Sequence, residues 1–223
     1  MTKRITVLLL CVAVALPMFA ESKMAKRLAD STAVLQATIK DIPPSISSKA
    51  VCVLIYPSVK KVGVGLGVTY GRGVLECRSG AQMNGKWSAP AMYTLDVGSL
   101  GPQLGSNSTD FVLVVLTTAG AQKILSGKLK LGADANATAG PSGANASGFN
   151  DTNIDVVTYS RAKGGLFAGA SLGSASMATD DTANKDLYGK EVNASQIING
   201  EVQTPAAGQP LVNLLDTSWP TRK

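Results

Sequence analysis

The sequence predicts an α+β fold, a curved and largely antiparallel β-sheet or partly closed barrel with an N-terminal amphipathic helix and small C-terminal helices. Three observations predict this class. Segments rich in β-branched and apolar residues outnumber helical segments along the 223 residues. Hairpin-length connections separate several of these segments, which favours antiparallel pairing. Near the N-terminus, apolar residues recur at helical spacing instead.

The predicted N-terminal helix covers residues 23–41, where Met24, Leu28, Leu35 and Ile39 recur on one side of the cylinder. A proline pair follows at 43–44 and ends the helix, because proline lacks the amide donor that a continuing helix needs. One short helical turn is expected between this pair and the first strand. Basic residues occupy the other faces of the helix, at Lys23, Lys26, Arg27 and Lys40.

Seven strands are predicted, and the one at 111–118 is expected to be central because it is apolar on both faces. A Gly-Arg-Gly connection at 71–73 is expected to join the second strand to the third. Residues 131–148 have the composition of loops or of a flat strand of small residues. Short helices are predicted at 121–126, 194–199 and 209–215. The predicted strands are residues 51–56, 62–70, 73–78, 91–97, 111–118, 154–160 and 166–174.

Glycine alternates with apolar residues in the second predicted strand. Gly63, Gly65 and Gly67 fall on one face of it, while valine and leucine occupy the other. Glycine costs backbone entropy inside a strand, so three on one face need a reason. They suggest that another sheet, a helix or a ligand chain packs very close to the backbone there.

The composition points away from an enzyme. The chain contains no histidine, which excludes imidazole-based triads, histidine-ligated metals and histidine proton shuttles. The glycine-rich segment fails as a dinucleotide site, because the pattern that starts at Gly65 requires glycine where Tyr70 stands. A phosphate loop is excluded as well, since Leu129 follows the Gly-Lys pair at 127–128. We therefore expect a binding protein that needs no cofactor or metal.

The first residues are typical of a Sec signal peptide over residues 1–20. Lys3 and Arg4 precede an apolar run that is shorter than a bilayer span, and the small residue Ala20 follows it. Residues 21–223 have the length of one domain, which we expect to be exported to a periplasm or the cell envelope. Without Lys3 and Arg4, 19 basic and 15 acidic residues remain. This mild excess suits anionic surfaces and is too small to indicate nucleic acid binding.

Two cysteines remain after cleavage, Cys52 and Cys77, and each lies in a predicted strand. In an oxidising compartment, a disulfide between them is one interpretation. The other is that both are small buried apolar side chains.

A series of short motifs along the chain resembles the SYLF domain, a lipid-binding module of bacterial exported proteins and of eukaryotic proteins of endocytosis. The resemblance runs from about residue 24 to about residue 215, with departures at Pro102 and at the glycine pair 164–165. It implies affinity for lipid, with the head group left open. The motifs are IP at 42–43, YPSVKK at 56–61, GKWSAP at 85–90, GSLGPQLG at 98–105, LGADA at 131–135, YSRAKGGLFAG at 159–169 and YG at 188–189.

The residues suggest where such lipid would bind. The amphipathic helix can lie in a membrane interface, can cover one end of the sheet, or can do both as a detachable lid. Basic residues near predicted strand ends can bind phosphate together with glycine-turn amides, or can be ordinary solubilising residues. Trp87 suits either a membrane interface or the core. The candidate lipid-binding residues are Lys23, Lys26, Arg27, Lys60, Lys61, Gly63, Gly65, Gly67, Arg72, Arg78, Lys86, Arg161 and Lys163.

Three functional hypotheses follow. The main one is non-enzymatic binding of anionic phospholipid or of a membrane surface in the bacterial cell envelope. A second is a soluble periplasmic carrier that holds an acyl chain against the alternating glycines. A third is a structural envelope protein without a ligand, whose glycine surfaces serve close packing or self-association.

Overall fold

A computed structural model of the chain describes residues 22–62, 68–97, 108–131, 133–134, 137–139, 154–162, 165–167 and 175–220. The helices are α1 Lys23–Thr38, the 3₁₀ helix η1 Ile39–Asp41, α2 Pro44–Ser47, α3 Thr118–Leu125, α4 Asp181–Tyr188, α5 Ala194–Ile198 and α6 Gln209–Ser218. The strands are β1 Cys52–Val62, β2 Val68–Cys77, β3 Ala91–Val97, β4 Thr109–Val115, β5 Lys128–Lys130, β6 Ala137–Ala139, β7 Val156–Ala162, β8 Gly165–Phe167 and β9 Ala175–Thr179.

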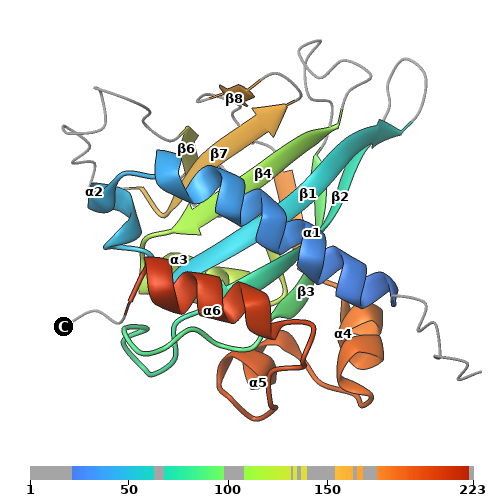
Figure 1. Ribbon diagram of the computed structural model, residues 1–223. Coiled ribbons are helices and arrows are strands. Elements are labelled where there is room, and N and C mark those ends of the chain that lie inside the picture. Colours follow the sequence, from blue (N-terminus) through green and yellow to red (C-terminus); the bar gives the residue numbers. More distant parts are fainter. Residues whose placement is uncertain are drawn as a thin grey trace, which may run out of the picture.

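Within the described residues, the strands form one sheet in the order β5-β9-β3-β2-β1-β4-β7-β6, and β8 also pairs with β7. Neighbouring strands are antiparallel throughout, except that β6 runs parallel to β7. The sheet is strongly curled (Figure 1). The predicted α+β class, with its curved antiparallel sheet, N-terminal helix and small C-terminal helices, is confirmed.

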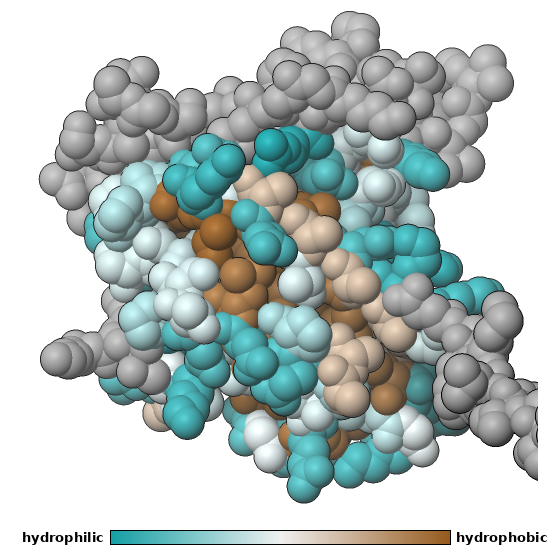
Figure 2. All heavy atoms as spheres, viewed as in Figure 1, coloured by the Kyte–Doolittle hydropathy of each residue, from teal (hydrophilic) through white to brown (hydrophobic). Residues whose placement is uncertain are grey.

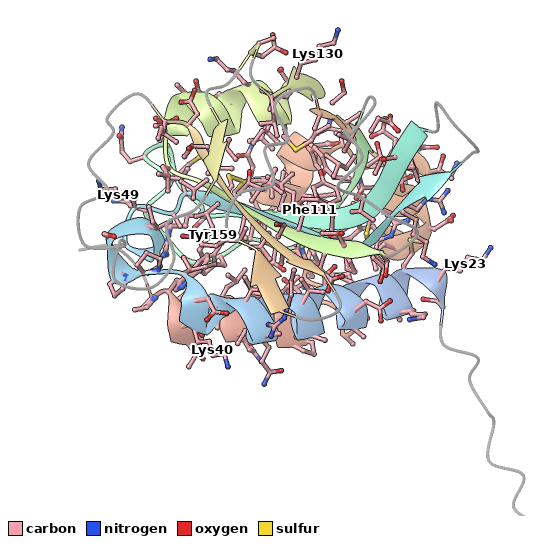
Figure 3. All side chains as sticks on the ribbon, turned by 90° about the horizontal axis from the view of Figure 1, so that it is seen from above. Lys23, Lys40, Lys49, Phe111, Lys130 and Tyr159 are labelled. Carbon is pink, nitrogen blue, oxygen red and sulfur yellow. A yellow bond between two sulfur atoms is a disulfide. The ribbon has the colours of Figure 1, made fainter. Side chains whose placement is uncertain are left out.

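The curled sheet separates two apolar cores. Side chains alternate along β1, so that Cys52 and Leu54 belong to an inner core while Val53 and Ile55 belong to an outer core. The inner core includes residues of α3 and α5, and the outer core includes residues of α1 and α6. Viewed from above, α1 and α6 lie together on one side of the sheet and α3 lies on the other (Figure 3). Both faces of the sheet are therefore covered.

Helix α1 follows the predicted pattern closely. The Ser22 hydroxyl caps its N-terminus by accepting a hydrogen bond from the Ala25 amide at 3.0 Å. Leu28 and Leu35 are fully buried in the outer core. The last turn tightens into η1, and the prolines that follow allow only the short helix α2 before β1.

The glycine-rich region differs from the prediction. Val62 ends β1 and Val68 begins β2, and these two residues pair with each other, so the chain reverses between them. The prediction of one continuous strand over residues 62–70 is therefore wrong. The predicted connection at 71–73 is also wrong, because these residues lie inside β2. Gly63, Gly65 and Gly67 fall outside the described residues.

Two glycines inside β2 do allow a close approach. The strand β1 is irregular between Ile55 and Lys60, and Ser58 in this stretch has a positive φ of 49°. The ring of Tyr56 lies directly over Gly73, where an added Cβ would be 2.5 Å from its Cδ1. At Gly71 an added Cβ would be 2.7 Å from Cγ2 of Val59. At these two positions, the protein's own side chains occupy the room that glycine leaves.

We expect Gly73→Ala to lower the free energy of unfolding by about 2 kcal/mol, because the new methyl group meets the Tyr56 ring and the Ile55 carbonyl in a packed core. Urea denaturation measures this loss. Arg72→Ala is the matched control on the same strand, since Arg72 is exposed, and its effect is expected to stay within about 0.5 kcal/mol. Equal stability of the two variants would contradict the close packing.

The C-terminal half contains elements that were not predicted. A strand was expected at 166–174, whereas β8 covers Gly165–Phe167 and β9 covers Ala175–Thr179, with residues 168–174 outside the described part. Helix α4 was not predicted, although its signals are in the sequence. The Asp180 carboxylate caps its first turn, and Gly189 ends it with a left-handed φ of 68°.

Candidate lipid-binding surface

Helices α1 and α6 lie side by side over the outer core, and together they form what we call the α1–α6 face (Figure 1). Some apolar side chains that pack on the outer core remain partly open to solvent on this face. Figure 2 shows an apolar area here, surrounded by hydrophilic atoms. The partly buried apolar residues of α1, η1 and α6 are Met24, Val34, Ile39 and Leu214.

Lysines stand at both ends of α1. Lys23 is exposed at its N-terminal end and Lys40 is exposed in η1. Lys40 extends away from the sheet, and Lys23 projects outward beyond the end of the helix (Figure 3). Lys26 is also exposed, and its ammonium group is 2.7 Å from the Asp30 carboxylate one turn later. An exposed ion pair of this kind is weak, so Lys26 can exchange its partner for a phosphate at small cost.

Two further cations share this side of the sheet. Arg72 lies two residues before Val74 of the outer core, so it points to the same side of β2 as the helices. Tyr70 raises the pKa of Arg72 by accepting its hydrogen bond, and the nearby Asp180 adds to the rise. The exposed Lys60 of β1 pairs with Tyr70 across the hairpin. The structure thus brings Lys60 and Arg72 to the side that carries α1.

Arg27 is not available to a head group. It lies on the sheet side of α1, next to the fully buried Leu28, and only 8% of it is exposed. Its guanidinium forms an ion pair of 2.9 Å with Asp180, the residue that caps α4. The expectation that Arg27 points outward with the lysines is therefore corrected, and Arg27 instead ties α1 to α4.

Arg78 is also not a surface cation, since only 1% of it is exposed. Its guanidinium donates to the carbonyl oxygens of Ala50 at 2.9 Å, Gly85 at 3.2 Å and Trp219 at 2.7 Å. It also lies 4.5 Å above the ring centre of Trp87. The position that we assigned to lipid phosphate therefore holds the C-terminal end of α6 against the sheet.

Trp87 occupies the core, which decides between the two interpretations of this residue. It belongs to the outer core, and its indole nitrogen donates to the Trp219 carbonyl at 3.0 Å. The two indole rings lie 6.0 Å apart. The end of α6 is thus anchored by Trp87 and Arg78 at one carbonyl oxygen.

The remaining predicted residues differ in their placement. Arg161 is half-buried and donates to the Ala37 carbonyl of α1 at 2.6 Å, which links β7 to the helix. Lys86 is exposed in the connection between β2 and β3. The backbone of Lys61 lies in β1, but its side chain is outside the described part of the structure, as is Lys163.

Cys52 and Cys77 form a disulfide in the structure, with an S–S distance of 2.04 Å. They are directly opposed in the β1–β2 pairing, and both are buried in the inner core. Both residues lie in strands, as predicted, whereas their direct opposition comes from the β1–β2 hairpin, which was not predicted.

Metal-binding clusters and membrane-spanning helices are both absent from the described residues. No group of three or more histidine, cysteine or acidic side chains gathers there in a way that would hold a metal ion. Within the same residues, every helix is too short or too polar to cross a bilayer.

The model of one protein family, described as Ysc84, Las17-binding protein actin regulator, matches residues 96–218. This match covers 123 of the 223 residues, from the end of β3 through α6. The chain belongs to the Ysc84 family. The resemblance to the SYLF domain is thereby confirmed, and the family description names a regulator and not an enzyme.

Relatives of this Ysc84-family chain include several eukaryotic proteins. It is 33% identical over 181 residues to an SH3 domain-containing protein of Schizosaccharomyces pombe, a match over 79% of the chain and 41% of the relative. It is 32% identical over 182 residues to LAS seventeen-binding protein 3 of Saccharomyces cerevisiae, over 79% of the chain and 38% of the relative. For SH3 domain-containing YSC84-like protein 1 of Homo sapiens the identity is 28% over 200 residues, over 87% of the chain and 57% of the relative. The chain therefore spans only about two fifths to three fifths of the length of these relatives.

Proposed function

We propose that this Ysc84-family protein binds anionic phospholipid at a membrane surface through the α1–α6 face, without catalysing a reaction. One observation carries the proposal: a partly exposed apolar area lies between two helices on one side of the molecule, with Lys23 and Lys40 beside it. Apolar side chains gain by entering the acyl boundary, while lysines at its margin are attracted to anionic head groups. Lys60 and Arg72 extend the positive charge along the same side.

We also propose that this binding takes place in a bacterial cell envelope. The signal peptide predicted over residues 1–20 lies outside the described residues. The disulfide between Cys52 and Cys77 supports the proposal, because disulfides form and persist in oxidising compartments such as the periplasm. The partner in this compartment would be the anionic lipid of a bacterial membrane.

Flotation of residues 21–223 with vesicles tests the lipid proposal. We expect association with vesicles that contain phosphatidylglycerol at low salt, weaker association at high salt, and little association with pure phosphatidylcholine. No association with any anionic vesicle at low salt would contradict the proposal.

The double variant Lys23→Glu/Lys40→Glu tests the assigned face. Each basic residue at a membrane surface contributes about 1 kcal/mol, so reversing two charges is expected to weaken binding by about tenfold or more. The matched control is Lys123→Glu/Lys130→Glu, which makes the same charge change at exposed lysines of α3 and β5. Lys130 lies on the opposite side of the sheet from Lys40 (Figure 3). Equal losses in both variants would show that net charge matters and the α1–α6 face does not.

The acyl-carrier alternative would require space beside the alternating glycines. Gly63, Gly65 and Gly67 are outside the described residues, whereas Tyr56 already fills the space over Gly73 in the same hairpin. No described residue therefore favours the carrier over surface binding. Lipid extracted from the purified protein and seen by mass spectrometry would favour the carrier.

A further inference from the structure

A carboxylic acid lies inside the outer core. Glu76, near the end of β2, is 1% exposed, and neither of its carboxylate oxygens has a hydrogen-bond partner among the described residues. Burial of a charged carboxylate without a partner costs several kcal/mol, so such groups are rare in packed cores. This residue took no part in the surface described above.

The position of Glu76 in the strand places it beneath α6. Val74 precedes it by two residues and belongs to the outer core, so the Glu76 side chain points to the same face of the sheet. Leu211 and Leu215 of α6 are fully buried in that core. Helix α6 crosses the sheet at this end of β1 and β2 (Figure 1).

The ionisable groups around Glu76 leave it without a direct ion pair in the described structure. On α6, Asp216 is close enough to disfavour a negative charge on Glu76. Arg78 follows Glu76 by two residues, directly after the end of β2, and donates to three carbonyl oxygens. Tyr188, at the end of α4, donates to the Pro90 carbonyl at 2.7 Å. The buried charged residue of α1 is Arg27, which is paired with Asp180.

These surroundings favour the protonated form of the acid. Burial raises the pKa of Glu76 well above its ordinary value, and the carboxylate of Asp216 adds to the rise. An acid whose pKa is raised in the packed state contributes full stability below its ordinary pKa. This contribution is lost as the pH rises towards the raised pKa. In that range Glu76 ionises readily when it is exposed to water, whereas ionising it inside the core costs free energy, so the closed arrangement of α6 becomes less stable.

We propose that α6 is a proton-controlled cover of the outer core, closed while Glu76 carries a proton and loosened when Glu76 ionises. The side chains that would become accessible are those of α6 and the sheet surface beneath it. Because α6 forms half of the α1–α6 face, this cover would regulate that face, and this consequence alone rests on the proposed function. Loosening at higher pH would expose additional apolar surface to a membrane.

The two tryptophans of the chain report on this movement without any ligand. Trp87 and Trp219 are its only tryptophans, and both are buried where the end of α6 meets the sheet. Acrylamide quenching of their fluorescence therefore follows the accessibility of this junction. Between the ordinary and the raised pKa, the ratio of loosened to closed α6 is expected to rise by up to about tenfold for each pH unit. The measurement covers the range from about pH 5 to about pH 9, below the ordinary pKa of tyrosine.

In the wild type we expect quenching to rise with pH while far-UV circular dichroism stays unchanged. Glu76→Gln keeps the size of the side chain and removes its ionisation, so its quenching is expected to be independent of pH. The proposal is overturned if wild-type quenching is flat over this range, or if Glu76→Gln shows the same rise.

Asp216→Asn provides a second variant in case Glu76→Gln does not fold. It removes the charge that helps to raise the pKa of Glu76, while its amide oxygen can still accept the hydrogen bond that Asp216 accepts from the Trp87 amide at 3.3 Å. The rise in quenching is expected to level off at lower pH than in the wild type, and an unchanged profile would contradict the proposal.

Vesicle flotation at both ends of the pH range is a separate measurement. Absence of vesicle binding would count against the lipid function and not against the proton-controlled movement of α6.

Discussion

Replacing Arg78 with methionine is expected to lower the free energy of unfolding by about 3 to 5 kcal/mol, because each buried carbonyl left without its donor costs about 1 to 3 kcal/mol and some relaxation offsets the sum. The guanidinium donates to Ala50 before β1, Gly85 in the β2–β3 connection and Trp219 after α6. Three segments far apart in the sequence therefore meet at one side chain. Methionine fills a similar volume and isolates the loss of the donors from the creation of a cavity.

Urea denaturation measures this change, and Arg72→Met provides the matched control. Arg72 lies in β2, which ends one residue before Arg78, but it is exposed and its polar partner is the nearby Tyr70. Its replacement is expected to cost less than about 1 kcal/mol. Arg78→Met could instead be as stable as Arg72→Met and bind anionic vesicles more weakly than the wild type does. Arg78 would then act at the lipid surface, and our structural assignment would be wrong.

The elements that the sequence predicted well are those with local signals. Residues 91–97 were predicted as a strand and form β3 with the same bounds. Helix α1 was predicted because Leu28 and Leu35 share a helix face and prolines follow. In both cases the side chains that define the pattern belong to one short stretch, so the local preference and the tertiary packing agree.

The glycine-rich hairpin was predicted incorrectly because its decisive contact is not local. Alternation of apolar residues and glycine is the same whether a strand continues or turns back. The pairing of Val62 with Val68 decides between them. The short strands β5 and β6 carry too few residues to show any period, and they exist through pairing with β9 and β7.

The candidate site was predictable in its charge but not in its geometry. The sequence does not distinguish Arg27, Arg72 and Arg78, yet of these three only Arg72 is exposed. Arg27 forms an ion pair with Asp180, and the buried Arg78 donates hydrogen bonds to backbone carbonyls. The contribution of α6 was not predicted. Leu214 joins the α1–α6 face only because α6 packs beside α1 from the far end of the chain.

Removing the disulfide with Cys52→Ala/Cys77→Ala is expected to lower the free energy of unfolding by about 3 kcal/mol. The two residues are 25 positions apart, and the bond restricts the loop between them in the unfolded chain. The folded state also loses two buried sulfur atoms from the inner core. Because the bond lies at one end of the β1–β2 ladder and the pairing continues from Val53 and Glu76 without it, we expect the variant to retain the native fold.

Thiol labelling and thermal unfolding of residues 21–223 check this prediction together. Without reductant, the denatured wild type is expected to react at no cysteine, and after reduction it is expected to react at two. Cys52→Ala is the control for labelling, because its remaining Cys77 must react without reductant once the chain is unfolded. Two reactive thiols in the untreated wild type, with a melting temperature equal to that of the double variant, would show that the cysteines serve as small apolar side chains. The support that the disulfide lends to export would then be lost as well, while the proposal of a lipid-binding face would be tested by the vesicle experiments alone.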